Sequence, residues 1–204
     1  EGIGGRYCIL SNPGLLMGAV LGYDIRALLD GAREMVERCL SAAADDNPAL
    51  LNAACKYLAA EKLGADVEVF MGYGDRLRSL GDWYVQLLSE SLGKRQDREG
   101  RTVYYCRTPV VATGTTDMHS MTQQHQDGKR NKVIQFLEVT RPAVALPVAN
   151  PFPGEPALDM YAGKEMDRLL KAALAANETA LTGDHRCSAR YILPSLEARY
   201  AGQL

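Results

Sequence analysis

Gln86 and Glu90 are the first residues of this chain whose types and spacing suggest chemistry. They lie four residues apart in the segment QLLSESLGK, residues 86–94, so in a helix they would share one face. A carboxylate beside the buried face near a helix end can be half-desolvated, which raises its pKa and suits it to general-base catalysis near neutral pH. A glutamate near a helix end is more often a solvated surface charge, so its neighbours must decide between these interpretations.

A basic residue near the start of the chain follows three glycines, which allow many backbone conformations. Arg6 follows the glycines Gly2, Gly4 and Gly5, and its guanidinium can hold a carboxylate or a developing oxyanion. The glycines alone do not predict a nucleotide site, because neither the GxxxxGK[ST] nor the GxGxxG spacing is present. The alternative interpretation of Arg6 is an ordinary surface arginine.

A histidine follows the turn Gly114–Thr116. His119 falls in the first turn of a predicted helix, where the helix dipole disfavours an added positive charge and keeps the imidazole neutral and able to exchange protons near pH 7. A structural or surface histidine is the alternative. His125 is six residues further on, not on the same face, and no cysteine or carboxylate pair completes a ligand set, so no metal site is expected. His185 lies in a polar loop, where we expect it to titrate in solvent.

Two groups of basic residues need no ligand to explain them. We expect most of them to be solvated, because acidic residues are interleaved with the first group. The groups are Lys94, Arg95, Arg98, Arg101 and Arg107, and Lys129, Arg130 and Lys132.

The elements that must position these side chains follow from apolar periodicity. The pattern predicts strands over residues 66–71, 107–112, 132–139 and 190–193, and a Pro-rich crossing loop over 141–156. It predicts helices over residues 14–21, 24–40, 48–63, 75–92, 117–126 and 159–182, the first of them buried. In the helix of Glu90, the predicted inward face comprises Leu77, Leu80, Tyr84 and Leu87.

Start and stop residues support these helices. Asp24, Asn47 and Asp75 are expected N-caps, and Gly64 and Gly93 are expected C-terminal stops. In the helix that follows Asp24, the expected inward residues are Ile25, Leu28, Leu29, Ala32, Val36, Cys39 and Leu40.

Alternation of strands and helices predicts an α/β fold with a parallel sheet covered on both faces. Ligands of such sheets bind outside the carboxyl ends of the strands. The loops that carry Gly72–Gly74 and Gly114–Thr116 are therefore candidates for a binding rim.

Composition narrows the class of protein. The 204 residues are 47% hydrophobic and 24% charged with a formal net charge of −2, which suits one globular domain, or one domain with an extension, and gives no sign of a nucleic-acid partner. Five cysteines without CxxC spacing are expected to be reduced, which favours a cytoplasmic location. No apolar run of membrane-spanning length and no signal peptide is seen. The missing initiator methionine and the end at Leu204, just inside a predicted helix, lead us to expect a domain from a longer polypeptide.

Several motifs in order resemble the second half of bacterial glucose-6-phosphate isomerase. Residues 4–11 (GGRYCILS) are similar to that family's G-G-R-[YF]-S-x-x-S segment, with Cys8 in place of the serine, and residues 86–94 match its Q-L-x-x-E-S-x-G-K signature. Residues 116–120 (TDMHS), followed by 127–128, resemble its A-T-D-Q-H-S…-D/E-G segment. Further likeness over residues 158–164, 192–194 and 202–204 extends the resemblance over nearly the whole chain.

The resemblance implies a sugar-isomerase (SIS) domain, a three-layer αβα sandwich with a mostly parallel five-stranded sheet. Residues 1–204 would be one such domain, the second half of a longer isomerase cut at both ends. The first SIS domain, with its phosphate-binding loop, and the C-terminal helix with a ring-opening lysine would be missing, so the piece alone is expected to be inactive. Lys164 follows Ala162 and Gly163, but its surroundings match a different family segment, so we expect an ordinary residue at a helix start.

The resemblance also implies the reaction. Glucose 6-phosphate and fructose 6-phosphate would interconvert through a cis-enediolate, without metal or organic cofactor. By motif match Glu90 would be the base, Arg6 would stabilise the enediolate, Gln86 would help place the substrate, and His119 would assist ring opening. In the family this histidine reaches the neighbouring subunit, so a homodimer is implied in which these groups meet around one sugar. The alternatives are a non-catalytic sugar-phosphate-binding SIS module and an isomerase of another phosphosugar.

Overall fold

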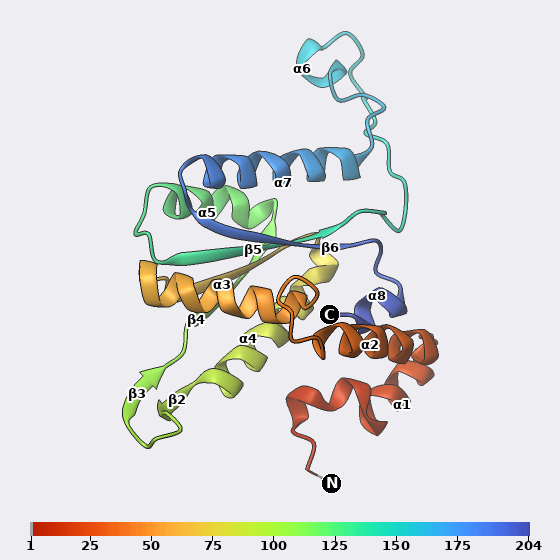
Figure 1. Cartoon of the computed structure of the whole chain (residues 1–204). Helices are drawn as coiled ribbons and strands as arrows, with labels where there is room; N and C mark the ends of the chain where they lie inside the picture. Colours follow the sequence, from red (N-terminus) through yellow and green to blue (C-terminus); the bar gives the residue numbers. More distant parts are fainter. Residues whose placement is uncertain (1) are drawn as a thin grey trace.

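The computed structural model describes residues 2–204 and contains a central parallel sheet between two layers of helices (Figure 1). The order of the main sheet is β4-β1-β5-β6, and all three strand pairs are parallel. The strands of the main sheet are β1 (Val67–Tyr73), β4 (Thr108–Gly114), β5 (Lys132–Val139) and β6 (Cys187–Leu193). The predicted α/β sandwich is confirmed, with four strands in the main sheet of the described chain where five were expected.

Helices cover both faces of the sheet. The longer ones are α1 (Asn12–Val20), α2 (Ile25–Cys39), α3 (Pro48–Leu63), α4 (Arg78–Leu92), α5 (Thr116–Gln126) and α7 (Met166–Gly183). The short ones are α6 (Pro156–Asp159), α8 (Ala198–Gly202) and the 3₁₀ turns η1 (Gly5–Leu10) and η2 (Asp75–Leu77). Helices α5 and α7 lie on one face of the sheet and α3 and α4 on the other (Figure 1).

Alternation along the strands divides the core into two layers. Val69 and Met71 of β1 point to the α5/α7 face and Phe70 to the α4 face. On β5, Phe136 and Leu137 are likewise fully buried on opposite faces. The central strands β1 and β5 are therefore buried on both sides, as expected for a doubly covered parallel sheet.

The predicted caps of two helices are confirmed. The Asp24 carboxylate accepts hydrogen bonds from the backbone N–H groups of Arg26 and Ala27 at the start of α2. Asn47 accepts from Leu50 N–H at the start of α3, and Gly64 ends that helix at φ +66°, a conformation that favours glycine. Asp75 is not a side-chain cap, because the chain first forms η2 and the α-helix begins at Arg78.

Two segments differ from the predicted pattern. The residues after α4 form a separate antiparallel hairpin, β2 (Lys94–Gln96) with β3 (Thr102–Tyr105), which the charged sequence did not reveal. The helix expected from residue 159 starts instead at Met166, because Gly163 adopts φ +71° and interrupts it. Lys164 thus lies two residues ahead of α7, in an arm that includes α6 and projects from the body (Figure 1).

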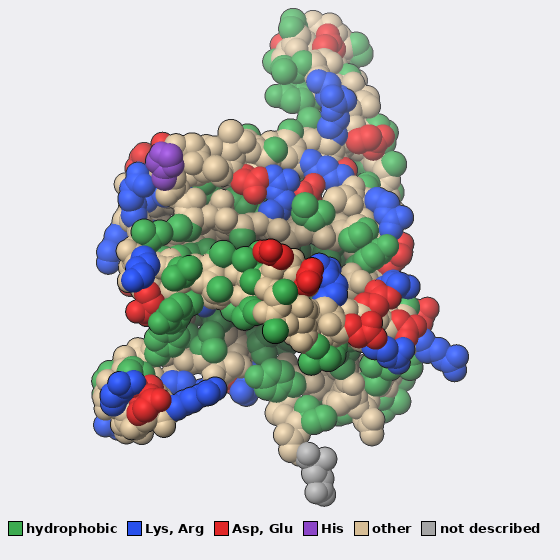
Figure 2. Space-filling view, in the orientation of Figure 1, with side chains coloured by type: hydrophobic (Ala, Val, Ile, Leu, Met, Phe, Trp, Pro, Cys, Tyr) green, Lys and Arg blue, Asp and Glu red, His purple; other side chains and the backbone are tan. Residues whose placement is uncertain are grey.

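The prediction that the first helix is buried is wrong. Helix α1 forms, but Leu16 is 65% exposed and Val20 is 73% exposed, because none of the described elements packs over them. The outer side of α2 behaves in the same way, with Val36 56% and Leu40 79% exposed where both were expected inward. Hydrophobic side chains accordingly appear on the surface around these helices in Figure 2.

None of the helices in residues 2–204 combines the length and the apolar character needed to cross a membrane.

Candidate active site

Arg6 and Glu90 meet although 84 residues separate them in sequence. The Nη1 atom of Arg6 lies 2.8 Å from Oε2 of Glu90, and the two groups form both a hydrogen bond and an ion pair. Arg6 comes from η1 and Glu90 from the last turn of α4. The two side chains meet within one chain, while their catalytic roles stay predictions.

The second oxygen of the carboxylate is held from within the helix. Gln86 Nε2 donates to Glu90 Oε1 at 3.0 Å, as the four-residue spacing predicted. The carboxylate of Glu90 thus has an amide on one oxygen and a guanidinium on the other. Its side chain is still 49% exposed, so it remains open to a ligand from solvent.

Residues that we did not single out from the sequence fix the position of Arg6. Ser91 Oγ accepts a hydrogen bond from Arg6 Nε at 3.2 Å and also lies 2.8 Å from the Tyr7 hydroxyl. Trp83 Nε1 donates to the Arg6 carbonyl at 2.8 Å, which ties η1 to α4. Each lies inside or next to a motif that carries Arg6 or Glu90, and that adjacency was the available signal.

The electrostatics favour a fixed cation here. The Arg6 guanidinium lies 4.7 Å from the centre of the Tyr7 ring. The Tyr7 phenol, followed by Glu90, raises the pKa of Arg6, while Ser91 and then Arg6 lower the pKa of Tyr7. The end of α4 also favours positive charge, and Lys94 Nζ donates to the Glu90 and Gly93 carbonyls, both at 3.4 Å.

His119 is not brought to this pair within one chain. It is exposed on α5, which packs on the face of the sheet opposite α4. The start of α5 contacts the start of α4, where Arg78 lies 3.7 Å from Asp117. Glu90 lies twelve residues further along α4, roughly 18 Å at about 1.5 Å per residue.

The carboxyl edge of the sheet carries a cleft of about 700 Å³. Tyr73 and Gly74, at the end of β1, contribute to its lining together with Arg141 and Ser195, so one of the two predicted rim loops does border a cavity. Gly72 and Tyr73 belong to β1 itself, and Gly114 to β4, so the strands run further than predicted. The Arg6–Glu90 pair lies toward the other end of α4 and does not line this cleft.

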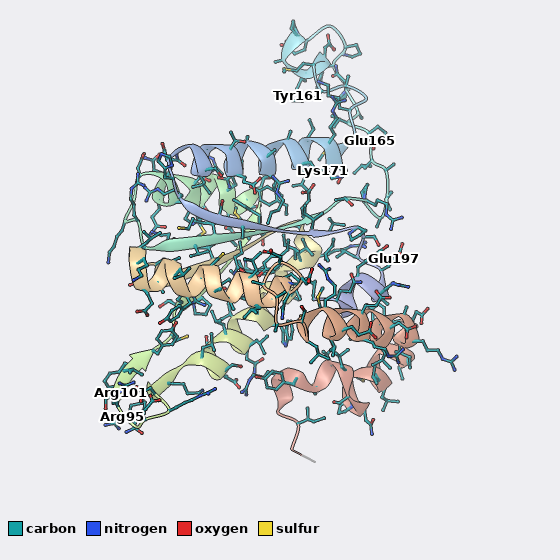
Figure 3. All side chains as sticks on the ribbon, viewed as in Figure 1. Arg95, Arg101, Tyr161, Glu165, Lys171 and Glu197 are labelled. Atoms are coloured by element: carbon teal, nitrogen blue, oxygen red, sulfur yellow. The ribbon has the colours of Figure 1, made fainter. Side chains whose placement is uncertain are left out.

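The first basic group is solvated as predicted, except for one residue. Figure 3 shows Arg95 and Arg101 on the β2–β3 hairpin, where both are exposed and Arg101 pairs with Asp97 at 2.6 Å. Arg107 is instead buried and donates from Nε to Glu68 Oε2 at 2.8 Å. Arg107 is the exception in a group most of which was predicted to be solvated, because the position before β4 places this side chain against an inward carboxylate on β1.

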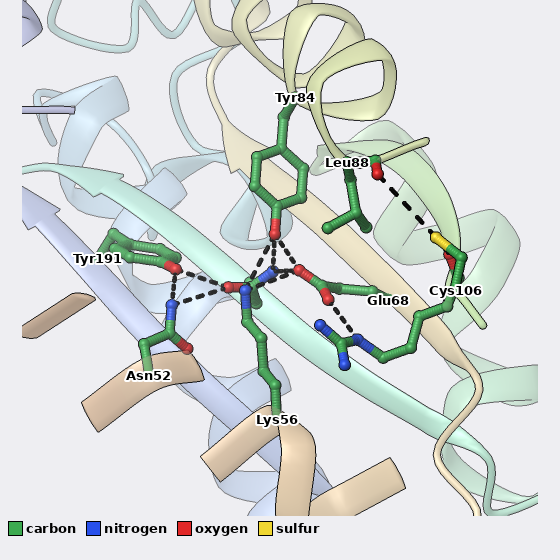
Figure 4. Close-up of polar contacts among 9 residues, drawn as sticks. Asn52, Lys56, Glu68, Tyr84, Leu88, Cys106 and Tyr191 are labelled. Atoms are coloured by element: carbon green, nitrogen blue, oxygen red, sulfur yellow. Dashed lines mark hydrogen bonds and ion pairs between the residues drawn. The ribbon is translucent and has the colours of Figure 1, made fainter. Parts of the chain in front are cut away.

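Glu68 is the centre of a buried polar network (Figure 4). It is 0% exposed, and its other oxygen, Oε1, pairs with Lys56 Nζ at 2.7 Å. Tyr84 and Gln135 also donate to that oxygen, so the carboxylate is fully partnered. The network joins α3, α4, β1 and β5, and its burial leaves no access for a ligand. It is a structural centre.

No group of three or more histidine, cysteine or acidic side chains in residues 2–204 is arranged to hold a metal ion. The chemistry available at the Arg6–Glu90 pair is proton transfer by a carboxylate beside a fixed cation.

Comparison with known proteins gives consistent similarities. Residues 1–149 match the family described as phosphoglucose isomerase. The chain is 41% identical over 202 residues to a glucose-6-phosphate isomerase of Carboxydothermus hydrogenoformans, covering 99% of this chain and 43% of that protein. It is 37% identical to one of Rubrobacter xylanophilus, covering 99% and 45% respectively. The chain therefore spans less than half the length of these relatives.

Solved structures agree on the fold. The crystal structure of a hypothetical protein from Thermus thermophilus superposes with a TM-score of 0.89 at 33% identity, over 98% of this chain and 46% of that one. A glucose-6-phosphate isomerase from Chlamydia trachomatis superposes with a TM-score of 0.82 at 23% identity, over 100% and 40%.

Proposed function

The chain belongs to the phosphoglucose isomerase family, and on that premise we propose that it is the second SIS domain of a longer glucose-6-phosphate isomerase. The observation that carries the proposal is the contact of the Glu90 carboxylate with the Arg6 guanidinium at 2.8 Å. Aldose–ketose isomerisation needs a base that moves a proton between adjacent carbons and a cation that stabilises the enediolate oxygen. Both groups are present and adjacent.

In the proposed reaction Glu90 takes the proton from C2 of the open-chain aldose and, as the carboxylic acid, returns it to C1, while the hydroxyl proton of O2 moves to O1 and the carbonyl forms at C2. The negative charge of the cis-enediolate faces the Arg6 guanidinium between the two steps. Gln86, which donates to Glu90 Oε1 at 3.0 Å, holds the carboxylate and helps to place the substrate.

Substrate entry must change the Arg6–Glu90 contact. In the direct ion pair, both carboxylate oxygens already accept hydrogen bonds, Oε2 from Arg6 and Oε1 from Gln86. A sugar inserted between the two groups would transfer the guanidinium to the substrate oxygen and free the carboxylate for proton transfer. The 49% exposure of the Glu90 side chain leaves room for that exchange.

We further propose that the enzyme is a homodimer in which the His119 of one subunit assists ring opening at the Glu90 of the other. This is supported by the exposure of His119 and by its position on the opposite face of its own sheet. A histidine placed there serves a site outside its own chain more readily than its own Glu90.

The rest of the substrate site would come from the first SIS domain and the C-terminal helix of the longer protein. Relatives more than twice as long as this chain, and the exposed apolar side of α1, support that view. The five cysteines, all unpaired within residues 2–204, suit a reducing location, and we propose the cytoplasm.

The test is Glu90→Gln in the complete protein. The variant keeps the size of the side chain but removes the base, so kcat for glucose 6-phosphate should fall about 10²–10⁴-fold. Glu99→Gln, on the exposed hairpin, is the matched control and should leave kcat unchanged. Normal turnover by Glu90→Gln would exclude the proposal, and higher kcat/KM on a different phosphosugar in a substrate panel would revise the substrate.

A further inference from the structure

A cationic pocket lies at the edge of the sheet opposite the carboxyl-edge cleft. It occupies about 180 Å³ where β1, β5 and β6 begin and α3 and α5 end. Its polar lining consists of His125, Lys129, Arg130, Lys132, His185 and Arg186. Figure 2 shows Lys and Arg side chains gathered at this edge, on the left of the view.

The four cations of this pocket have no carboxylate partner. None of the ion pairs found within residues 2–204 includes Lys129, Arg130, Lys132 or Arg186. No acidic side chain belongs to the lining.

Two carboxylates next to pocket residues in sequence accept hydrogen bonds from side-chain amides. Asp66 accepts a hydrogen bond from the Asn131 amide at 2.6 Å, and Asp184 accepts from the Gln126 amide. Neither carboxylate forms an ion pair with a cation of the pocket, so Asp66 offsets only part of the positive charge, that of Lys132.

His125 adds a buried, unpartnered group to the pocket. The residue is 2% exposed, and neither Nδ1 nor Nε2 has a hydrogen-bond partner among the described residues. A polar atom buried without a partner costs about 1–3 kcal/mol, so an occupant that bonds to it is favoured. Burial, and then Lys132, lower the pKa of His125, which leaves a neutral ring with one N–H to donate.

Arg186 presents a second unpartnered donor. Its Nε is buried without a partner, while Nη2 donates to the backbone carbonyls of Gln126 and Gly128. The carbonyls at the end of α5 are acceptors for Nη2, as expected for a cation near a helix C-terminus. Nε of Arg186 and the ammonium group of Lys129 have no hydrogen-bond acceptor within residues 2–204.

We propose that this pocket binds a phosphate group, as inorganic phosphate or as the phosphoryl group of a small metabolite. Charge-assisted donors from Lys132, Arg186 and His125 would surround the oxygens, and the volume of about 180 Å³ equals that of roughly six water molecules, enough for a phosphate group. This site is separate from the Arg6–Glu90 pair and does not depend on the proposed function.

Histidine resonances give a site-specific test in the full chain. The chain has three histidines, so a ¹³C-labelled imidazole spectrum contains three ring signals. Titration with inorganic phosphate at constant ionic strength should shift the His125 signal saturably, and chloride should not. Glycerol phosphate is the second probe and distinguishes the two sources of the phosphate group. A lower Kd for glycerol phosphate indicates a phosphorylated metabolite, and a lower Kd for inorganic phosphate indicates the free ion.

Variants assign the binding to the pocket. Lys132→Gln and Lys129→Gln should each weaken phosphate binding about tenfold or more. Lys164→Gln, on the exposed arm, and Arg6→Gln, at the Arg6–Glu90 pair, should leave phosphate binding to this pocket unchanged. An absent or non-saturable shift, an equal response to chloride, or full affinity in both Lys132→Gln and Lys129→Gln would overturn the proposal.

Discussion

Arg6 is held at several points, and this separates it from an ordinary surface arginine. Its Nη1 binds Glu90, its Nε binds Ser91, and its carbonyl accepts from Trp83. Each contact removes a rotational freedom that a free arginine would retain. The guanidinium is therefore already oriented when a developing oxyanion forms, which is the condition for strong electrostatic stabilisation of a transition state.

This argument predicts the effect of Arg6→Lys in the complete protein. Lysine keeps the charge but loses the planar fork that contacts both Glu90 and Ser91. We expect kcat for glucose 6-phosphate to fall about 10²–10³-fold with a smaller change in KM, as measured by steady-state kinetics. Arg95→Lys on the hairpin is the control. A variant with full kcat would show that charge alone, without orientation, is sufficient.

Residue-scale prediction from sequence succeeded where side chains share a helix turn and failed where they meet across strands. The Gln86–Glu90 contact follows from their spacing. The partner of Arg107 does not, because Glu68 is 39 residues away and nothing local marks an inward carboxylate on an apolar strand. Such pairs depend on sheet register, which was not part of the sequence pattern.

At the scale of elements, the Glu68 network joins helices to the sheet. Lys56 comes from α3, Tyr84 from α4 and Gln135 from β5, and all three contact one carboxylate (Figure 4). A buried charge that loses its partner is costly, whereas an apolar replacement of the whole set need not be. The effects of substitutions within the network on the free energy of unfolding should therefore not be additive.

We expect Glu68→Gln and Lys56→Met each to lower the free energy of unfolding by about 3–5 kcal/mol, because each leaves an opposite charge buried with fewer partners. The double variant should lose less than the sum of the two. Urea unfolding of the full chain measures all three, with Glu61→Gln on the exposed side of α3 as control. Strict additivity would contradict a coupled network.

The same carboxylate predicts a pH dependence. Burial alone would raise the pKa of Glu68, but Lys56, Tyr84 and Arg107 outweigh it and hold its pKa below the ordinary value of 4.5. A lowered folded-state pKa stabilises the protein above the unfolded pKa, and this stability is lost as the pH falls through the folded value. The difference in unfolding free energy between wild type and Glu68→Gln should therefore be constant above about pH 5.5 and shrink below about pH 4.5. A difference that does not change with pH would exclude this origin.

The elements themselves were largely predictable, and the reason is visible in α3 and β5. Helix α3 has an Asn47 cap, Pro48 at its first turn and Gly64 at its end, which are local signals. Strand β5 has the predicted bounds, residues 132–139. Helix α1 shows the limit, because an apolar sequence predicts burial without indicating what provides it.

At the scale of the whole molecule, the apolar side of α1 and the exposed Glu90 would both be covered by other parts of the longer protein that we propose. Leu16 and Val20 are 65% and 73% exposed, and η1, which carries Arg6, lies next to α1 and contacts α4. Surface of this kind marks an interaction site. An element that covers α1 would thus lie close to the candidate site and help to enclose it.

This predicts that one pair of substitutions has different effects in two settings. Leu16→Lys with Val20→Lys should leave the unfolding free energy of the 204-residue chain nearly unchanged, within about 0.5 kcal/mol, because both side chains already face solvent. In the complete protein the same pair should lower stability by about 2–5 kcal/mol and reduce isomerase activity, because two charges would be buried without partners. Thermal unfolding of both proteins measures the change in stability, and steady-state kinetics of the complete protein measures the change in isomerase activity. Equal, small effects in both would mean that α1 stays exposed in the complete protein and that the cover over Glu90 comes from elsewhere.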